Sequence, residues 1–148
     1  MKALIQRVSS ARVVIEGKTA GSICNGLCIL AGIASGDTED DIDYLVNKLL
    51  NLRIFADSSG KFNFSVLDIG GELLLVSQFT LLADTRKGRR PSFTRASPPE
   101  EAENLFELFV KKCRSSGLKT ETGRFQAMMQ VHIVNDGPVT IMLDSREK

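Results

Sequence analysis

Leu73-Leu74-Leu75-Val76-Ser77-Gln78-Phe79-Thr80-Leu81 is the stretch on which the predicted fold depends. Four consecutive apolar residues after Gly70-Gly71 predict a strand that is buried on both faces. Polar side chains then follow in hydrophobic surroundings, where a polar group without a partner costs about 1–3 kcal/mol. Two interpretations of Ser77, Gln78 and Thr80 stay open. Either they satisfy backbone groups at a strand end, or they form the polar floor of a pocket.

The chain before this stretch predicts an antiparallel part of the sheet. Strands are expected at residues 3–8 and 11–16 (one long strand broken by Ser9-Ser10), 19–23 and 27–33. Turn signals separate them at Glu16-Gly17-Lys18 and at Asn25-Gly26. The order of strands and turns predicts a meander, in which each strand pairs with the next.

Two helices are predicted to pack on the sheet. The first opens at Asp37-Thr38, has an acidic first turn and runs to about Arg53. The second starts at Ser97-Pro98-Pro99-Glu100, with Ser97 as its N-cap, and ends at Gly117. Both carry apolar residues at helical spacing. The expected fold class is a single α+β domain over residues 1–148, with an antiparallel-rich, barrel-like sheet and two main helices.

The C-terminal region predicts a further hairpin. Residues 130–134 alternate like a half-buried strand, Asn135-Asp136-Gly137-Pro138 turns, and residues 139–143 return as a second strand. Two interpretations of Gly137-Pro138 stay open. The pair is a tight turn, or it is a rigid projection that presents carbonyl groups to a ligand.

Composition limits the classes of function. A formal charge of +1 means that a nucleic-acid partner must be held by a local basic patch. Five cations between Arg86 and Arg95 form the one such concentration, which is a solvated loop or a phosphate-binding surface. No apolar run is long enough for a membrane span and the N-terminus lacks a signal-peptide core, so a cytoplasmic protein is expected.

Several catalytic and metal sites are excluded by residue type. The three cysteines lack paired zinc spacing, and Cys24 and Cys28 are expected to be small core residues. His132 is the single histidine, and no Gly-x-Ser-x-Gly elbow accompanies it, so a serine triad is not supported. We expect His132 to be structural. Catalysis, if present, must therefore use hydroxyls, amides and the backbone, without metal or cofactor.

The motif at residues 77–81, together with Asn135-Asp136-Gly137-Pro138-Val139-Thr140, strongly resembles the D-aminoacyl-tRNA deacylase family. The likeness extends over nearly the whole chain. It includes residues 3–8, 61–63, 70–72 and 87–93. Two separated motifs in the right order are far more specific than either motif alone.

The resemblance implies a homodimer in which a Gly137-cisPro138 hairpin reaches into the pocket of the neighbouring subunit. The two carbonyls would bind the amino group of the substrate and block an L side chain. The residues assigned to support of this motif are Arg7, Asn135 and Thr140. Arg7 would fix the hairpin in place.

The resemblance also assigns the pocket. Gln78, Phe79 and Thr80 are the expected catalytic residues around the scissile ester, and Ser77 is expected to bind substrate. Phe125 and Met129 match positions that line the pocket of the terminal adenosine, and the alternative is that they are core residues four apart on a helical turn. The tRNA backbone would be bound by Arg86, Lys87, Arg89 and Arg90.

The implied reaction is hydrolysis of the ester between a D-amino acid and the 3′-terminal ribose of tRNA. Exclusion of the L side chain offers no means of rejecting glycine, so cleavage of glycyl-tRNA is expected as well. Water attack assisted by the ribose 2′-hydroxyl is preferred, because no base stands beside Thr80 to activate it. Two alternatives stay open: a non-catalytic tRNA-binding module, and an amidohydrolase with a threonine or cysteine nucleophile.

Overall fold

The first strand, β1 (Lys2–Ile15), joins most of the sheet in the computed structural model, which describes residues 1–147. One edge of β1 pairs first with β3 (Gly26–Gly32) and then with β2 (Lys18–Ile23). The other edge pairs with β8 (Gln130–Asp144), and all three pairings are antiparallel. The predicted meander is therefore wrong, since β3 pairs with β1 and not with β2. Lys148, the last residue of the expected domain, lies outside the described residues.

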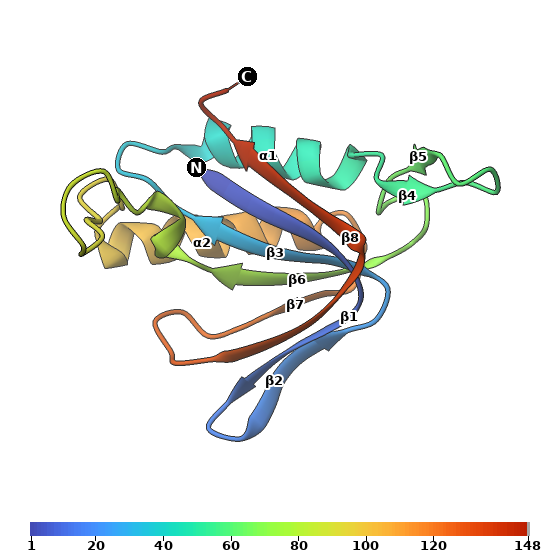
Figure 1. The fold of residues 1–148 in the computed structure, drawn as a ribbon, viewed down its shortest axis with the longest axis horizontal. Helices are drawn as coiled ribbons and strands as arrows, with labels where there is room; N and C mark the ends of the chain where they lie inside the picture. Colours follow the sequence, from blue (N-terminus) through green and yellow to red (C-terminus); the bar gives the residue numbers. More distant parts are fainter. Residues whose placement is uncertain (148) are drawn as a thin grey trace.

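The predicted break at Ser9-Ser10 does not interrupt β1. Ser10 still pairs with Val134 of β8, and the irregularity appears instead as shifts of register between Gln6 and Ser10. Because β1 bends here, its first half pairs with β3 and its second half pairs with β2, as Figure 1 shows.

The apolar stretch forms β6 (Glu72–Ser77), which runs parallel to β3 and to the short β7 (Thr120–Thr122). Leu73 and Leu75 point to a core that includes α1 and α2, whereas Leu74 and Val76 point to a second core enclosed by the curled sheet. Both faces of β6 are therefore buried, as predicted. The mixed, nearly closed, barrel-like sheet with two helices confirms the expected fold class (Figure 1).

The helices α1 (Glu39–Asn51) and α2 (Pro99–Arg114) confirm the predicted pair. Thr38 and Asp41 form a capping box at the start of α1. In α2 the N-cap is Pro98 and not Ser97, because a residue before a proline avoids the helical region and the helix cannot begin until Pro99.

The predicted hairpin at residues 135–138 is wrong, because β8 does not reverse. Gln6 pairs with Thr140 and Val8 pairs with Asn135, so residues 136–139 stand opposite Arg7 alone and bulge out of the strand. Both halves of β8 continue along the same partner β1, which leaves the four residues as a projecting loop (the 136–139 bulge) and not a turn between strands.

Three shorter elements complete the described chain: β4 (Phe55–Ala56), β5 (Phe62–Phe64) and the single 3₁₀ turn η1 (Phe79–Leu82).

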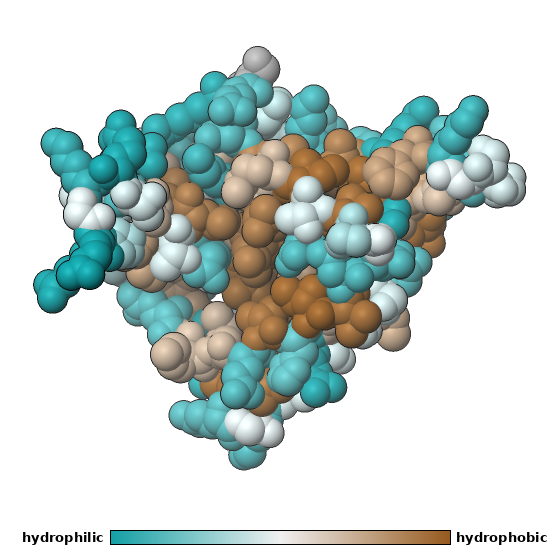
Figure 2. Space-filling model, in the orientation of Figure 1, coloured by the Kyte–Doolittle hydropathy of each residue, from teal (hydrophilic) through white to brown (hydrophobic). Residues whose placement is uncertain are grey.

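Hydrophobic side chains gather across the middle of the molecular face where β1 and β8 cross it (Figure 2). Two exposed hydrophobic residues belong to β8: Val134, 56% exposed, and Met142, 47% exposed. Neither helix within residues 1–147 has the length and apolar character needed to cross a membrane.

Candidate active site

A cleft of about 730 Å³ opens where β6 ends, beside the start of α2 and the segment that leads into β8. Five of the predicted site residues line it: Ser77, Gln78, Phe79, Phe125 and Met129. Ile33, Ser97, Pro99 and Ala102 line it as well. Sequence reasoning missed these four. Ser97 and Pro99 carry only the signal of a helix start, and Ile33 and Ala102 have apolar side chains that mark no chemistry.

The polar floor of the cleft follows directly from the end of β6. Gln78 still donates its backbone N–H to Ala31 O, at 2.7 Å, but its own dihedrals (φ −145°, ψ 81°) take the chain out of the sheet and into η1. The Gln78 side-chain amide donates to the Thr80 hydroxyl. Ser77 and Gln78 face the cleft, which favours the pocket-floor interpretation for these two, whereas Thr80 is exposed just outside the cleft lining.

Phe79 presents a large aromatic surface at the cleft entrance, since 54% of the residue is exposed. The rings of Phe79 and Phe93 form a T-shaped contact, with centroids 4.9 Å apart and planes at 67°. Such a contact is worth about 0.5–1.5 kcal/mol beyond area burial. Phe93 was missed as a site residue, although its place at the end of the basic run was a usable signal.

Phe125 and Met129 lie in an irregular segment, so the alternative of a helical turn is wrong. Gln126 has φ +59°, outside the range of a right-handed helix. Phe125 packs on Phe106 at 6.3 Å between centroids, on the helix side, and Met129 packs on the core inside the sheet. Each side chain thus bridges a core and the cleft.

The Gly137–Pro138 peptide bond is cis and both residues are exposed. Arg7 holds the base of the 136–139 bulge: its Nε donates to Asp136 O at 3.0 Å and its Nη1 donates to Ile54 O at 2.5 Å. Gly137 has φ +129°, and a Cβ there would lie 3.0 Å from Arg7 Nη2 and 2.9 Å from a methyl group of Val139. The bulge therefore requires glycine at this position.

Asn135 and Thr140 close the base of the bulge, and they pair with Val8 and Gln6, the two neighbours of Arg7 in β1. The Asn135 amide donates to the Thr140 hydroxyl at 3.1 Å, and its oxygen accepts from Val139 N at 3.2 Å. Gln6 donates to the same hydroxyl at 3.4 Å. The three residues predicted to support the motif are thus grouped around it.

Within one chain the bulge and the cleft do not meet. Gly137 stands opposite Arg7 of β1, and the register across β3 puts Arg7 level with Leu73 of β6. Ser77, at the end of β6, is level with Ala3 of β1 instead. Four residues along the strands and three strand spacings across the sheet separate them by about 20 Å. The predicted site residues therefore form two groups on each chain.

The predicted tRNA-binding residues occupy an exposed loop over residues 85–91, the basic loop, closed by paired hydrogen bonds between Asp84 and Ser92. Arg86 donates to both carboxylate oxygens of Asp84, which holds the pKa of Asp84 well below its usual range and raises that of Arg86. Among the described residues, three cations of the loop form no ion pair: Lys87, Arg89 and Arg90. Asp84, which restrains Arg86, was missed.

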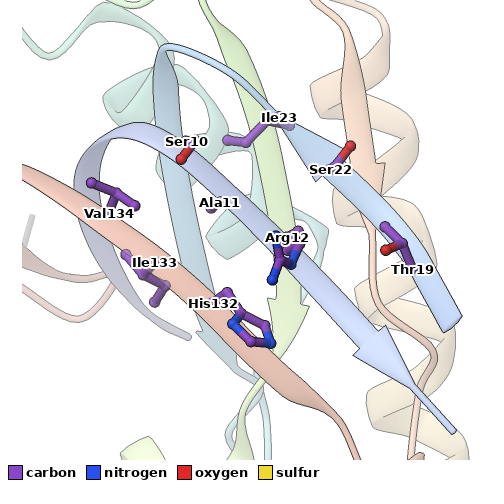
Figure 3. Close-up of a pocket in the computed structure, with 9 residues that line it drawn as sticks. All are labelled: Ser10, Ala11, Arg12, Thr19, Ser22, Ile23, His132, Ile133 and Val134. Atoms are coloured by element: carbon purple, nitrogen blue, oxygen red, sulfur yellow. The ribbon is translucent and has the colours of Figure 1, made fainter. Parts of the chain in front are cut away.

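A second hollow, of about 510 Å³, lies on the outer face of β1, β2 and β8 (Figure 3). Arg12 and His132 are register partners there and project to the same side. The residues that line the hollow include no carboxylate. His132 thus stands on an alternating strand without an acidic partner among them, and the geometry does not make it a general base.

The cysteines do not form a reactive site. Burial raises the pKa of Cys28 and of Cys113 to about 12, so both stay protonated at neutral pH. Cys24 is exposed, and its predicted place in the core is wrong, because it sits in the turn between β2 and β3. Within residues 1–147, no three His, Cys, Asp or Glu side chains are grouped so that they could hold a metal ion.

Comparison with known proteins assigns this chain to a protein family. A family model described as D-Tyr-tRNA(Tyr) deacylase matches residues 4–144, which makes the chain an enzyme of the hydrolase class. The chain belongs to the D-Tyr-tRNA(Tyr) deacylase family, in agreement with the resemblance of its two motifs.

Curated relatives agree with this assignment, and solved structures share the fold. A D-aminoacyl-tRNA deacylase of Dehalococcoides mccartyi is 60% identical, with 100% of this chain and 97% of the relative covered. A D-aminoacyl-tRNA deacylase of Aquifex aeolicus is also 60% identical, with 99% of each covered. A solved structure named c-Myc DNA Unwinding Element Binding Protein has a TM-score of 0.92 and 45% identity, covering 97% of this chain and 98% of its own. A probable eukaryotic D-amino acid tRNA deacylase, 16% identical with a TM-score of 0.86 over 96% and 97% of the two chains, shares the fold.

Proposed function

We propose that this chain hydrolyses the ester bond of D-aminoacyl-tRNA and releases free D-amino acid and tRNA. The observation that carries the proposal is the single cleft that collects Ser77, Gln78, Phe79, Phe125 and Met129 in a chain of the deacylase family. A substrate of this kind belongs to translation, and the protein would act in the cytoplasm.

The chemistry of the site is hydrolysis by water. The first N–H groups of a helical turn have no partner within it, so those of Phe79 and Thr80 are candidates to hold the developing oxyanion. An aminoacyl ester is already activated, and one aimed donor contributes about 3–4 kcal/mol. The ribose 2′-hydroxyl assists the attacking water, and Thr80, fixed by the Gln78 amide, orients the ester.

A second copy of the chain would supply the groups that discriminate D- from L-aminoacyl substrates. The bulge is exposed and about 20 Å from the cleft of its own chain, so only a partner's cleft is within reach of the Gly137 and Pro138 carbonyls. These acceptors suit the amino group of a substrate and leave no room for an L side chain. The exposed apolar residues Val134 and Met142 on the same strand are suited to an interface between copies.

Other residues are suited by their chemistry to bind the terminal adenosine and the backbone phosphates of tRNA. Phe125 and Met129 offer half-buried apolar and aromatic surface to the terminal adenosine. The basic loop, with Arg86, Lys87, Arg89 and Arg90, supplies cations for backbone phosphates.

Parallel assays with D-tyrosyl-tRNA and L-tyrosyl-tRNA test the function. We expect release of D-tyrosine and retention of the L ester, and glycyl-tRNA should also be cleaved. Retention of tRNA without turnover would instead support a nucleic-acid-binding module, an alternative favoured by the basic loop and by the likeness to the c-Myc DNA Unwinding Element Binding Protein. A trapped acyl-enzyme at Thr80 or a cysteine would support the amidohydrolase.

Mixing two inactive variants tests the shared site. Gln78→Ala damages the cleft and Gly137→Ala damages the bulge, so a mixed dimer holds one doubly damaged site and one intact site. Random exchange should restore about a quarter of the wild-type activity. Absence of any recovery, in dimers shown by sedimentation to have exchanged, would contradict the cross-subunit arrangement.

A further inference from the structure

A small cavity of about 80 Å³ lies at the base of the basic loop, where three distant parts of the chain meet. Lys2 reaches it from the start of β1, Arg95 from the segment after the basic loop, and Arg146 from the segment after β8. Leu82, the last residue of η1, forms part of its wall. No motif of the sequence brings these three cations together.

The cavity carries an excess of positive charge. Lys2 lies 3.4 Å from Asp144, and the buried ammonium of Met1 lies 2.7 Å from Asp37. Arg146 stands 3.7 Å from Asp37, which the Met1 ammonium already neutralises, and the charge of Arg95 acts on Asp84, which Arg86 already contacts through both oxygens. Asp41 adds a third carboxylate near the Met1 ammonium. Met1, Lys2 and Arg146 thus share these carboxylates, whereas Arg95 forms no ion pair with any described residue, so positive charge exceeds negative charge at the cavity.

Size and geometry select the ligand. A volume of about 80 Å³ corresponds to two or three water molecules, at about 30 Å³ each, which is room for a phosphate group and too little for a base or a sugar. Two guanidinium groups that converge from different segments suit the oxygens of a phosphate better than a single carboxylate. Arg146 keeps 58% of its side chain exposed while it donates to Ser35 O at 3.2 Å, so it is both anchored and accessible.

The position of the cavity connects it to the substrate. Leu82 lines the cavity and Phe79 lines the cleft, and the two residues are the ends of the same 3₁₀ turn, about 6 Å apart along its axis. A strand whose terminal adenosine occupies the cleft can therefore reach the cavity with a nearby phosphate. In the chain, the basic loop (residues 85–91) lies between Leu82 and Arg95, which both line the cavity, so only a few residues separate its cations from the cavity.

We propose that Arg95 and Arg146, with Lys2, form a pocket that binds a phosphate group of the acceptor arm of tRNA, in addition to the contacts of the basic loop. The inference rests on the proposed function, because it takes the tRNA body as the source of the phosphate. Arg146 is a binding residue for the body of the substrate and makes no contact with the reacting ester.

The test compares Arg146→Gln and Arg95→Gln with wild type on D-tyrosyl-tRNA over a range of salt concentrations. Loss of one phosphate contact should raise KM about fivefold at 0.1 M salt and lower the slope of log KM against log salt by about 0.7. kcat should stay unchanged. Arg146→Lys should recover the salt slope, because it keeps the charge, but only part of the loss in KM, because an ammonium lacks the guanidinium fork. Arg53→Gln, an exposed arginine at the opposite end of α1, is the matched control.

Two further substrates identify the phosphate. D-tyrosyl-adenosine, which has no phosphate, should be cleaved equally by wild type and Arg146→Gln. D-tyrosyl-tRNA without its 5′-phosphate distinguishes two sources of the bound phosphate. If the pocket binds the 5′-phosphate, wild type and Arg146→Gln should no longer differ on this substrate. If it binds a phosphodiester, the difference should persist. An unchanged salt slope in both glutamine variants, in protein whose circular dichroism is native, would overturn the pocket. Failure of wild type to cleave D-tyrosyl-tRNA would instead overturn the proposed function.

Discussion

Replacement of Arg7 by lysine would remove the forked contact that holds the 136–139 bulge against the sheet. Arg7 is 11% exposed at its side chain and binds two carbonyl oxygens from different segments, Asp136 O and Ile54 O. A lysine ammonium is a single point and cannot reach both oxygens. One hydrogen bond to a charged group would be lost, and a nearly buried carbonyl at Ile54 would lose its partner.

The expected cost is about 2 kcal/mol in the free energy of unfolding, which for a chain of this size lowers Tm by about 4–8 °C. Displacement of the bulge by about 1 Å should also reduce kcat/KM on D-tyrosyl-tRNA by tenfold or more, because the carbonyls of Gly137 and Pro138 would no longer be placed for a partner's cleft. Denaturant unfolding and deacylation rates measure the two effects on the same preparation.

Arg12→Lys is the control, because Arg12 lies on the same strand but is exposed, and a surface change of this kind should alter stability by less than about 0.5 kcal/mol. If Arg7→Lys lost the expected stability but retained full activity, the bulge would not belong to the site. Unchanged stability would refute the energetic reasoning itself.

Three further expectations address individual side chains. Thr80→Ala should retain most activity in single-turnover deacylation, whereas a loss above about a thousandfold would identify Thr80 as the nucleophile. Phe93→Ala removes the edge contact to Phe79 and should lower kcat on D-tyrosyl-tRNA about threefold to tenfold, with Phe93→Tyr restoring it. Maleimide at pH 8 should label Cys24 alone: at a pKa of about 12, roughly one in ten thousand of the molecules carries a thiolate at either buried cysteine, and rapid labelling of three sites would contradict this.

Local patterns in the sequence predict the elements of this fold better than their pairing. The run Leu73–Val76 predicts β6 because a strand between two cores needs apolar residues on both faces. The turn signals at Asn25-Gly26 and at residues 135–138 mark real breaks, yet neither joins neighbouring strands. Both errors arise from β1, whose 14 residues are long enough to pair with three strands, and the choice of partner is a tertiary property.

The candidate site divides in the same way. Ser77, Gln78 and Phe79 follow from one contiguous motif, so their common location is a local consequence of the end of β6. Phe93 was marked in the sequence only by its place at the end of the basic run, and its contact with Phe79 forms through folding. Arg146 reaches the cavity through folding as well, and no local pattern marks it.

The pairing of Lys2 with Asp144 joins the two ends of the chain in one ladder. On the ribosome, β1 emerges long before β8 has been synthesised. The edge of β1 that pairs with β8 has no strand partner until then. Contacts between residues so distant in sequence slow folding, because the intervening chain must close before they form. The ladder along this edge of β1, and with it the carbonyl-bearing bulge, can therefore form only after β8 has been synthesised.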